Sequence, residues 1–185
     1  MKKMWVAVMM VCLAGFALSG CGPQFEALTL SGDNADASNS WSMGEDSAGP
    51  ERAVDGNEET DWAGMGIGAY SVDTDPAAEY WWSIDLGEEQ PVSRIEMVIN
   101  RIIIAGSGDT ATRAGGKEYH VESSANGTAW TAITGAAGTL KQTQTAVLAQ
   151  FTKVKTQYIR IVFDSCYAHV PVINEIKIYK SKGII

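Results

Sequence analysis

The chain has 185 residues, of which 14 are Lys or Arg and 22 are Asp or Glu, so its formal net charge at pH 7 is -8. Nucleic acids and anionic lipid surfaces repel a protein this acidic, and we expect neither to be a partner. The length is sufficient for one domain with a substantial core.

Residues 1–20 are predicted to be a signal peptide. The segment begins with Lys2 and Lys3, continues with an apolar run over residues 4–18, and ends with small residues before Cys21. This layout is typical of bacterial secretory signals and is too short for a membrane-spanning helix. The remaining 12 basic and 22 acidic residues then give the exported chain a net charge of -10.

The end of this signal, "LSGC" (residues 18–21), resembles a lipobox. That resemblance implies cleavage before Cys21 and lipidation of Cys21, with residues 21–30 as a short tether. Several acyl chains hold a protein stably on a membrane. We therefore expect an exported protein of the cell envelope, anchored by lipid at the outer membrane or cell surface. A plain signal peptide or an uncleaved anchor is the alternative.

Beyond the signal, apolar residues recur with a period of two, which favours β-strands over helices. The period is clearest in "RIEMVIN" (94–100), "YIRIVF" (158–163) and "NEIKIY" (174–179). The segments 117–124 and 128–133 flank Asn126-Gly127, a typical hairpin-turn sequence. Short strands separated by Gly, Asp and Ser loops predict an all-β antiparallel sandwich.

Several aromatic and polar residues are expected to serve the fold rather than a ligand. Trp62 and Trp82 are interpreted as core residues, and Asp85 in "SIDLG" as a residue that sets a turn. Cys166 is left without a disulfide partner when Cys12 leaves with the signal and Cys21 is lipidated. It is expected to be a half-buried, unreactive thiol.

Four segments occur in the order found in discoidin domains, also called coagulation factor 5/8 type C domains. They are "ERAVDGNEETDW" (51–62), "YWWSIDLGEEQPVSRIEMVINR" (80–101), "KEYHVESSANGTAW" (117–130) and "QYIRIVF" with "INEIKIY" (157–179). The sequence resembles that family over residues 31–182. The resemblance implies a jelly-roll β-sandwich of the galactose-binding-like type, as in family 32 carbohydrate-binding modules.

In sugar-binding members of the family, the loop matching "ERAVDGNEETDW" holds a structural calcium ion. Calcium prefers six to eight oxygen ligands on a tightly turned loop. The resemblance implies ligands from the side chains of Asp55, Thr60 and Glu175 and from the backbone of Arg52 and Asn57. The alternative is that Asp55 and Thr60 simply cap the turn with local hydrogen bonds.

The family places its ligand on loops at one end of the sandwich. By position, Arg101 matches an arginine that hydrogen-bonds sugar hydroxyls, and Tyr167 matches an aromatic residue that stacks on the sugar ring. Further candidates for ligand contacts on the same loops are Tyr70, Arg113 and His169.

Two departures from the family pattern concern the ligand loops, and the second argues against fucose specificity of the lectin type. Ala63 stands where many family 32 modules have a histidine, and Ile103 stands where the fucose lectins have an aspartate.

The sequence shows no arrangement of nucleophile and base, phosphate-binding loop or zinc-protease motif, so no enzyme activity is expected. The predicted function is calcium-supported glycan binding by a non-catalytic module. Two alternatives stay open: a structural or adhesion module that binds an envelope protein, and an accessory subunit of a separate hydrolase.

Overall fold

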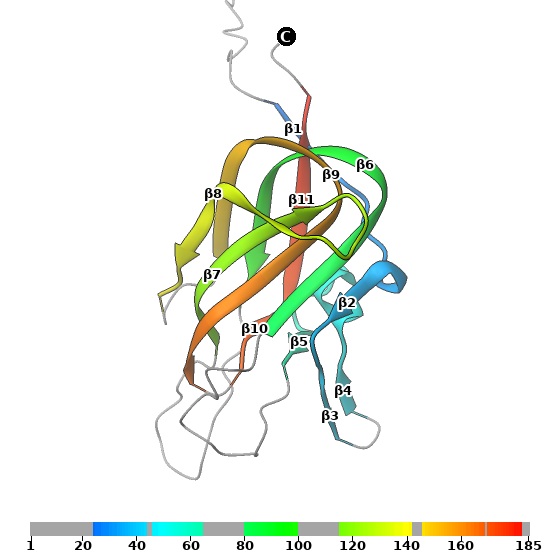
Figure 1. Cartoon of the computed structure of the whole chain (residues 1–185). Helices are drawn as coiled ribbons and strands as arrows, with labels where there is room; N and C mark the ends of the chain where they lie inside the picture. Colours follow the sequence, from blue (N-terminus) through cyan, green and yellow to red (C-terminus); the bar gives the residue numbers. More distant parts are fainter. Residues whose placement is uncertain are drawn as a thin grey trace, which may run out of the picture.

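The computed structural model describes residues 24–43, 46–64, 80–99, 115–141, 146–168 and 170–182. Strands dominate these residues (Figure 1). The strands are β1 (Phe25–Ala27), β2 (Ala35–Ala37), β3 (Trp41–Met43), β4 (Asp46–Ala48), β5 (Trp62–Ala63), β6 (Tyr80–Val98), β7 (Gly115–Ser124), β8 (Thr131–Thr139), β9 (Ala146–Ala168), β10 (Val172–Ile173) and β11 (Glu175–Ser181). Two short 3-10 helices are η1 (Gly32–Asn34) and η2 (Pro50–Val54).

The main sheet has the strand order β1-β11-β6-β9-β7-β8, with β2 also paired to β6. All of its pairings are antiparallel. The long strands β6 and β9 pair with each other on both sides of register shifts near residues 85–94. Figure 1 shows both strands bending over the top of the molecule. Each therefore contributes to both layers of the jelly-roll β-sandwich that the sequence predicts.

The period-two segment predicted at residues 94–100 forms, up to Val98, the second part of one continuous bent strand, β6, which begins at Tyr80. Gly87, Glu88 and Glu89 are exposed at the bend, so period-two burial is interrupted there and resumes at Ser93, in phase with Ile95 and Met97. Asp85 sets this bend, since its Oδ1 accepts hydrogen bonds from Gly87 N–H (2.8 Å) and Gln157 Nε2 (3.0 Å). The turn-setting role predicted for Asp85 is therefore confirmed.

The core lies between the two layers and consists of the inward-facing half of each strand. Period-two alternation predicted its members correctly in β6, β9 and β11, because successive side chains of a strand point to opposite faces. Both Trp62 and Trp82 are fully buried, as predicted. The other large core side chains are Ile84, Val92, Ile95, Met97, Ile159, Ile161, Phe163, Ile173, Ile176 and Ile178.

Cys166 packs against this core at intermediate exposure. Burial raises the pKa of its thiol to about 12, because a thiolate would lose its hydration. The thiol therefore stays protonated at neutral pH, in agreement with the unreactive role expected from the sequence.

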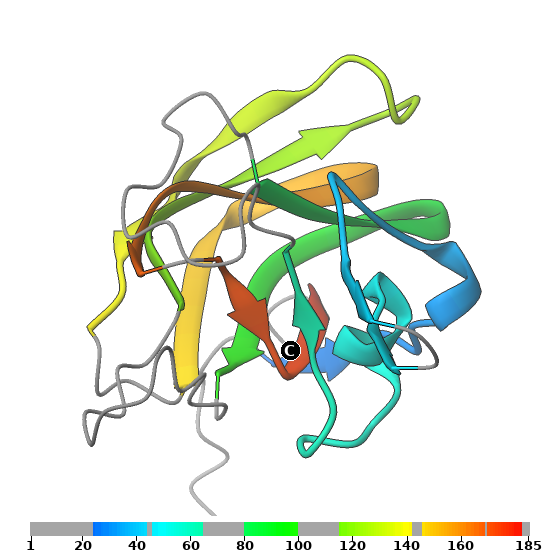
Figure 2. The ribbon, with the colours of Figure 1, turned by 90° about the horizontal axis from the view of Figure 1, so that it is seen from below.

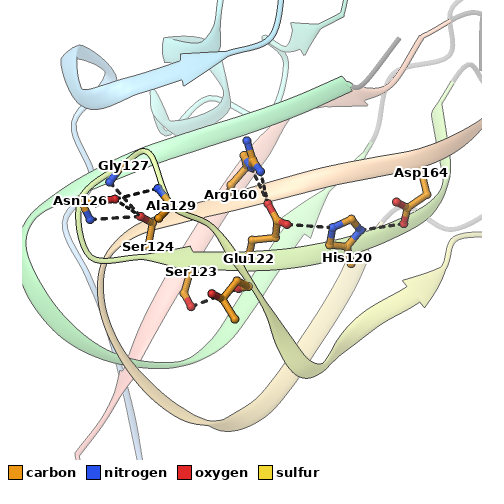
Figure 3. Close-up of polar contacts among 10 residues, drawn as sticks. His120, Glu122, Ser123, Ser124, Asn126, Gly127, Ala129, Arg160 and Asp164 are labelled. Atoms are coloured by element: carbon orange, nitrogen blue, oxygen red, sulfur yellow. Dashed lines mark hydrogen bonds and ion pairs between the residues drawn. The ribbon is translucent and has the colours of Figure 1, made fainter. Parts of the chain in front are cut away.

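The predicted hairpin joins β7 to β8 through residues 125–130 (Figure 3). Gly127 adopts a left-handed φ of 74°, and its N–H donates to Ser124 Oγ at 3.0 Å. Asn126 Oδ1 accepts from the N–H groups of Thr128 and Ala129 at 3.0 and 2.9 Å. The turn is longer than the two residues of the Asn-Gly signal, because β8 begins only at Thr131.

Both ends of the described chain lie side by side. β1 pairs with the last residues of β11, and Lys182 N–H donates to Gln24 O at 2.9 Å. Figure 1 shows β1 at the top of the molecule and the small β5–β10 pair near the bottom. Among the described residues, no helix has the length and apolar character needed to cross a membrane.

Candidate functional site

The candidate metal loop, residues 49–60, is anchored by buried tryptophans near its two ends. At its start, Trp82 Nε1 donates to Pro50 O at 2.9 Å. Directly after it, Trp62 is buried and donates through Nε1 to Asn39 O at 3.1 Å. Between them the chain turns sharply at Gly56, whose φ of 78° suits a residue without a side chain.

Three oxygen atoms of this loop converge. Thr60 Oγ1 lies 2.7 Å from Asp55 Oδ2 and 2.8 Å from Asn57 O. A hydroxyl has one hydrogen, and neither an ionised carboxylate nor a carbonyl has any, so the two contacts share that hydrogen or only one of them is a hydrogen bond. In both cases three oxygens lie close together with a single proton among them.

A hard cation bound between oxygens this close together would offset their mutual repulsion. Neighbouring oxygens in a shell of six to eight ligands, each roughly 2.3–2.6 Å from a calcium ion, lie roughly 3 Å apart. Thr60 Oγ1 already lies at about that spacing from Asp55 Oδ2 and from Asn57 O. Their donor types (carboxylate, hydroxyl and carbonyl) are also the types that calcium prefers.

Glu175, at the start of β11, faces the same loop from 119 residues further along the chain. Its Oε2 accepts the Gly56 N–H at 3.2 Å, and the residue is only 6% exposed. Burial raises the pKa of the Glu175 carboxyl; the Gly56 hydrogen bond lowers it, and the nearby Asp55 carboxylate raises it again. A buried carboxylate beside a second one is a position that a bound cation would stabilise.

The predicted ligand set is thus partly assembled. Thr60 Oγ1 contacts Asp55 and the carbonyl of Asn57, and Glu175 reaches the same loop at the neighbouring Gly56 N–H. Arg52 lies in η2, where its N–H donates to Gly49 O at 3.1 Å. In the described ranges, no three His, Cys, Asp or Glu side chains are grouped to hold a metal. The residues present fit an ion held by two carboxylates together with hydroxyl and carbonyl oxygens.

Sequence reasoning missed Asn174, the neighbour of Glu175. Its Nδ2 donates to Glu58 O at 3.2 Å and to Thr60 O at 3.0 Å. Asn174 is buried, at 2% exposure. No local signal in the sequence marks it, because an asparagine before a strand is equally compatible with an exposed turn.

The short strands β5 and β10 form a two-residue ribbon next to this loop, at the end of the sandwich away from β1 (called the pole here). β5 follows the candidate metal loop, β10 precedes Asn174, and the two strands pair antiparallel (Figure 2). Gly64 N–H donates to Pro171 O at 3.1 Å beyond the ribbon. A Cβ at Gly64 would approach the Tyr80 ring to 2.8 Å, so the backbone at Gly64 lies close against that ring.

Of the five residues predicted to contact a ligand, Tyr167 lies in the part of the chain that the structure describes. It is half-buried near the end of β9, where its hydroxyl donates to Leu140 O at 2.5 Å. Lys117 Nζ lies 6.0 Å from its ring centroid. The hydroxyl is therefore occupied within the protein, and the ring is the part left for a stacking role. Tyr70, Arg101, Arg113 and His169 lie outside the described residues, as does Cys21.

A polar network crosses the outer face of β7 and β9 (Figure 3). Arg160 pairs with Glu122, Glu122 lies 3.5 Å from His120 Nε2, and His120 Nδ1 lies 3.0 Å from Asp164 Oδ2. The Arg160 guanidinium also lies over the rings of Trp81 and Trp130, at 5.7 and 4.5 Å. Both ring nitrogens of His120 thus face carboxylates, and the network explains why these polar side chains occupy one sheet face.

The fold and the loop order can now be compared with known proteins. Residues 34–176 match the F5/8 type C domain. The chain belongs to the F5/8 type C domain family. A search of curated protein sequences found no match.

Solved structures share the fold of this F5/8 type C domain at low sequence identity. The family 32 carbohydrate-binding module of NanJ from Clostridium perfringens, solved with galactose, has a TM-score of 0.62 and 19% identity; the match covers 85% of this chain and 100% of that one. The C. perfringens module CpGH89CBM32-5, solved with GalNAc-β-1,3-galactose, gives 0.62 and 14%, covering 83% and 99%. The AlyQ module, solved with 4,5-unsaturated mannuronic acid, gives 0.59 and 20%, covering 83% and 97%.

Proposed function

We propose that this chain is a non-catalytic glycan-binding module of the cell envelope. The observation that carries the proposal is the shared fold: an F5/8 type C jelly roll that aligns over almost the full length of modules solved with galactose and GalNAc-β-1,3-galactose. The proposed glycan site is the pole reached by the β5–β10 ribbon, where the chain carries Tyr167 and the sequence places Tyr70, Arg101, Arg113 and His169.

A calcium ion is proposed to support this pole. It would be held by the side chains of Asp55, Thr60 and Glu175 and by the backbone of Arg52 and Asn57. Its chemical role would be to neutralise two neighbouring carboxylates and to satisfy the crowded loop oxygens. The role proposed for the ion is structural rather than direct contact with the glycan.

A glycan array tests the proposed function. The chain from residue 22 is expected to bind a defined class of glycan with roughly micromolar to millimolar affinity, because a shallow loop site buries little of a small ligand. Truncating Arg101 or Tyr167 to alanine should weaken binding by about 1–3 kcal/mol, the usual cost of removing a charged hydrogen bond or a packed polar partner. The array is run with calcium and with a chelator.

Trp130→Ala is the matched control for the array. Trp130 is a partly exposed aromatic residue beside the β7–β8 turn, at the other end of β7 from the Gly115–Ala168 pair next to Tyr167. Its removal should leave glycan affinity unchanged. If no glycan binds, and substitutions at Tyr70, Tyr167 or His169 instead abolish co-purification of an envelope protein, the chain serves as an assembly surface and the glycan proposal is wrong.

We also propose that lipid on Cys21 anchors the module. The lipobox-like "LSGC" supports this, and Gln24 and β1 lead the chain away from the pole proposed for the glycan. Cells supplied with labelled fatty acid should incorporate the label into the protein, and Cys21→Ser should abolish incorporation and detergent partitioning. Unchanged partitioning and migration of the variant would rule the anchor out.

A further inference from the structure

The loop that carries the candidate calcium ligands is pinned by one side chain from outside it. Asn174 Nδ2 donates to the carbonyls of Glu58 and Thr60, at 3.2 and 3.0 Å. Asn174 is itself fixed, because its N–H donates to Val98 O at 2.8 Å and its side chain is buried between the loop and the sheet. The contact joins residues more than 110 positions apart in the chain.

These two bonds restrict the peptide units that join Glu58 to Glu59 and Thr60 to Asp61. Thr60, whose carbonyl is held, supplies the hydroxyl that approaches Asp55 and Asn57. Glu58, whose carbonyl is held as well, directly follows Asn57, which supplies the carbonyl of the crowded group. A loop free to move would separate three oxygens that crowd one another, and Asn174 opposes that movement.

Asn174 and Glu175 also act on the loop from consecutive positions. Glu175 accepts the N–H of Gly56 near the start of the turn, and Asn174 donates to carbonyls near its end. The dipeptide, which lies at the junction of β10 and β11, thus holds the loop at Gly56 and again at Glu58 and Thr60. Pre-organised ligands raise affinity because less ordering remains to be done on binding.

We propose that Asn174 is a positioning residue of the calcium site: it touches no ion, but it holds the loop in the ion-binding conformation before calcium arrives. This inference rests on the proposed calcium site. Groups that orient metal ligands typically contribute 10–100-fold to metal affinity. Asn174→Ala is therefore expected to weaken calcium binding by about 10–100-fold.

The experiment measures calcium dissociation constants by titration calorimetry on the purified protein, its Asn174→Ala variant and a milder Asn174→Ser variant. Hydrogen exchange is measured alongside, without calcium and at saturating calcium. In Asn174→Ala, the amides of Gly56, Asn57 and Thr60 should exchange faster without calcium and regain protection when the ion saturates the site. The faster exchange should be confined to these loop amides, with the core amides of β6 and β9 unchanged, a pattern that general loss of stability would not produce.

Asn126→Ala is the matched control. It also removes an asparagine that holds a loop through two backbone hydrogen bonds, but at the β7–β8 turn, so calcium affinity should stay the same. Unchanged affinity in both Asn174 variants, or an equal loss in Asn126→Ala, overturns the inference while the calcium site stands. Absence of calcium binding by the unaltered protein overturns the calcium site and this inference together.

Discussion

Trp82→Ala is expected to lower the free energy of unfolding by about 3–5 kcal/mol, the range measured for truncating large buried aromatic residues. Trp82 is 0% exposed, so its removal leaves a cavity that the rigid sheets around it fill only in part. It also removes the donor to Pro50 O at the start of the candidate metal loop. Urea unfolding followed by circular dichroism measures the change.

Two further variants separate the contributions of Trp82. Trp82→Phe keeps most of the buried volume and loses the Pro50 hydrogen bond, so it should cost less than Trp82→Ala. Trp130→Ala removes a partly exposed tryptophan that packs against Arg160, and should cost about 1 kcal/mol. A Trp82→Ala variant as stable as Trp130→Ala would contradict the assignment of Trp82 to the core.

Calcium is expected to stabilise the protein, and Asp55→Ala to abolish that effect. At a concentration about 100 times its dissociation constant, calcium should raise the free energy of unfolding by about 2.7 kcal/mol. For a domain of this size the melting temperature should then rise by roughly 5–10 °C. Thermal melts with calcium and with a chelator measure the shift. A melt insensitive to calcium, with no metal in the purified protein, would favour the turn-capping interpretation of Asp55 and Thr60.

Glu175→Gln tests the same calcium site as Asp55→Ala but removes only a charge. The amide oxygen can still accept the Gly56 N–H, while the buried charge is gone. Because folding raises the pKa of Glu175, its charged form opposes folding, and this penalty grows as pH rises above the usual carboxyl range. Without calcium at pH 7, Glu175→Gln should therefore melt no lower than the unaltered protein. With calcium, the variant should lose most of the stabilisation.

Much of the fold follows from local pattern. Period-two alternation identified the buried faces of β6, β9 and β11, because a residue that faces the core in a strand shares its face with its second neighbours. The bend of β6 was not predicted as part of one strand, since exposed Glu88 and Glu89 read locally as a loop. Only the continued pairing with β9 past the register shift makes it a single strand.

The candidate metal loop shows what sequence leaves out. Resemblance to a family supplied Asp55, Thr60 and Glu175; Thr60 contacts Asp55, and Glu175 reaches the same loop at Gly56. Asn174 was missed because its role depends on contact with Glu58 and Thr60. Those residues are more than 110 positions away in the chain, so the contact leaves no local sign in the sequence. An asparagine before a strand is locally compatible with an exposed turn, and its burial is visible only in three dimensions.

The pairing of β1 with the end of β11 brings Gln24 and Lys182 into hydrogen-bond contact at the edge of the sheet. A domain whose two ends lie next to each other can be joined to other chains or inserted into a loop with little rearrangement. Here a stalk, a membrane or a neighbouring domain attached through either end would meet the same side of the molecule. The β5–β10 ribbon would point away from the attachment in each case, so this architecture exposes one pole regardless of what carries it.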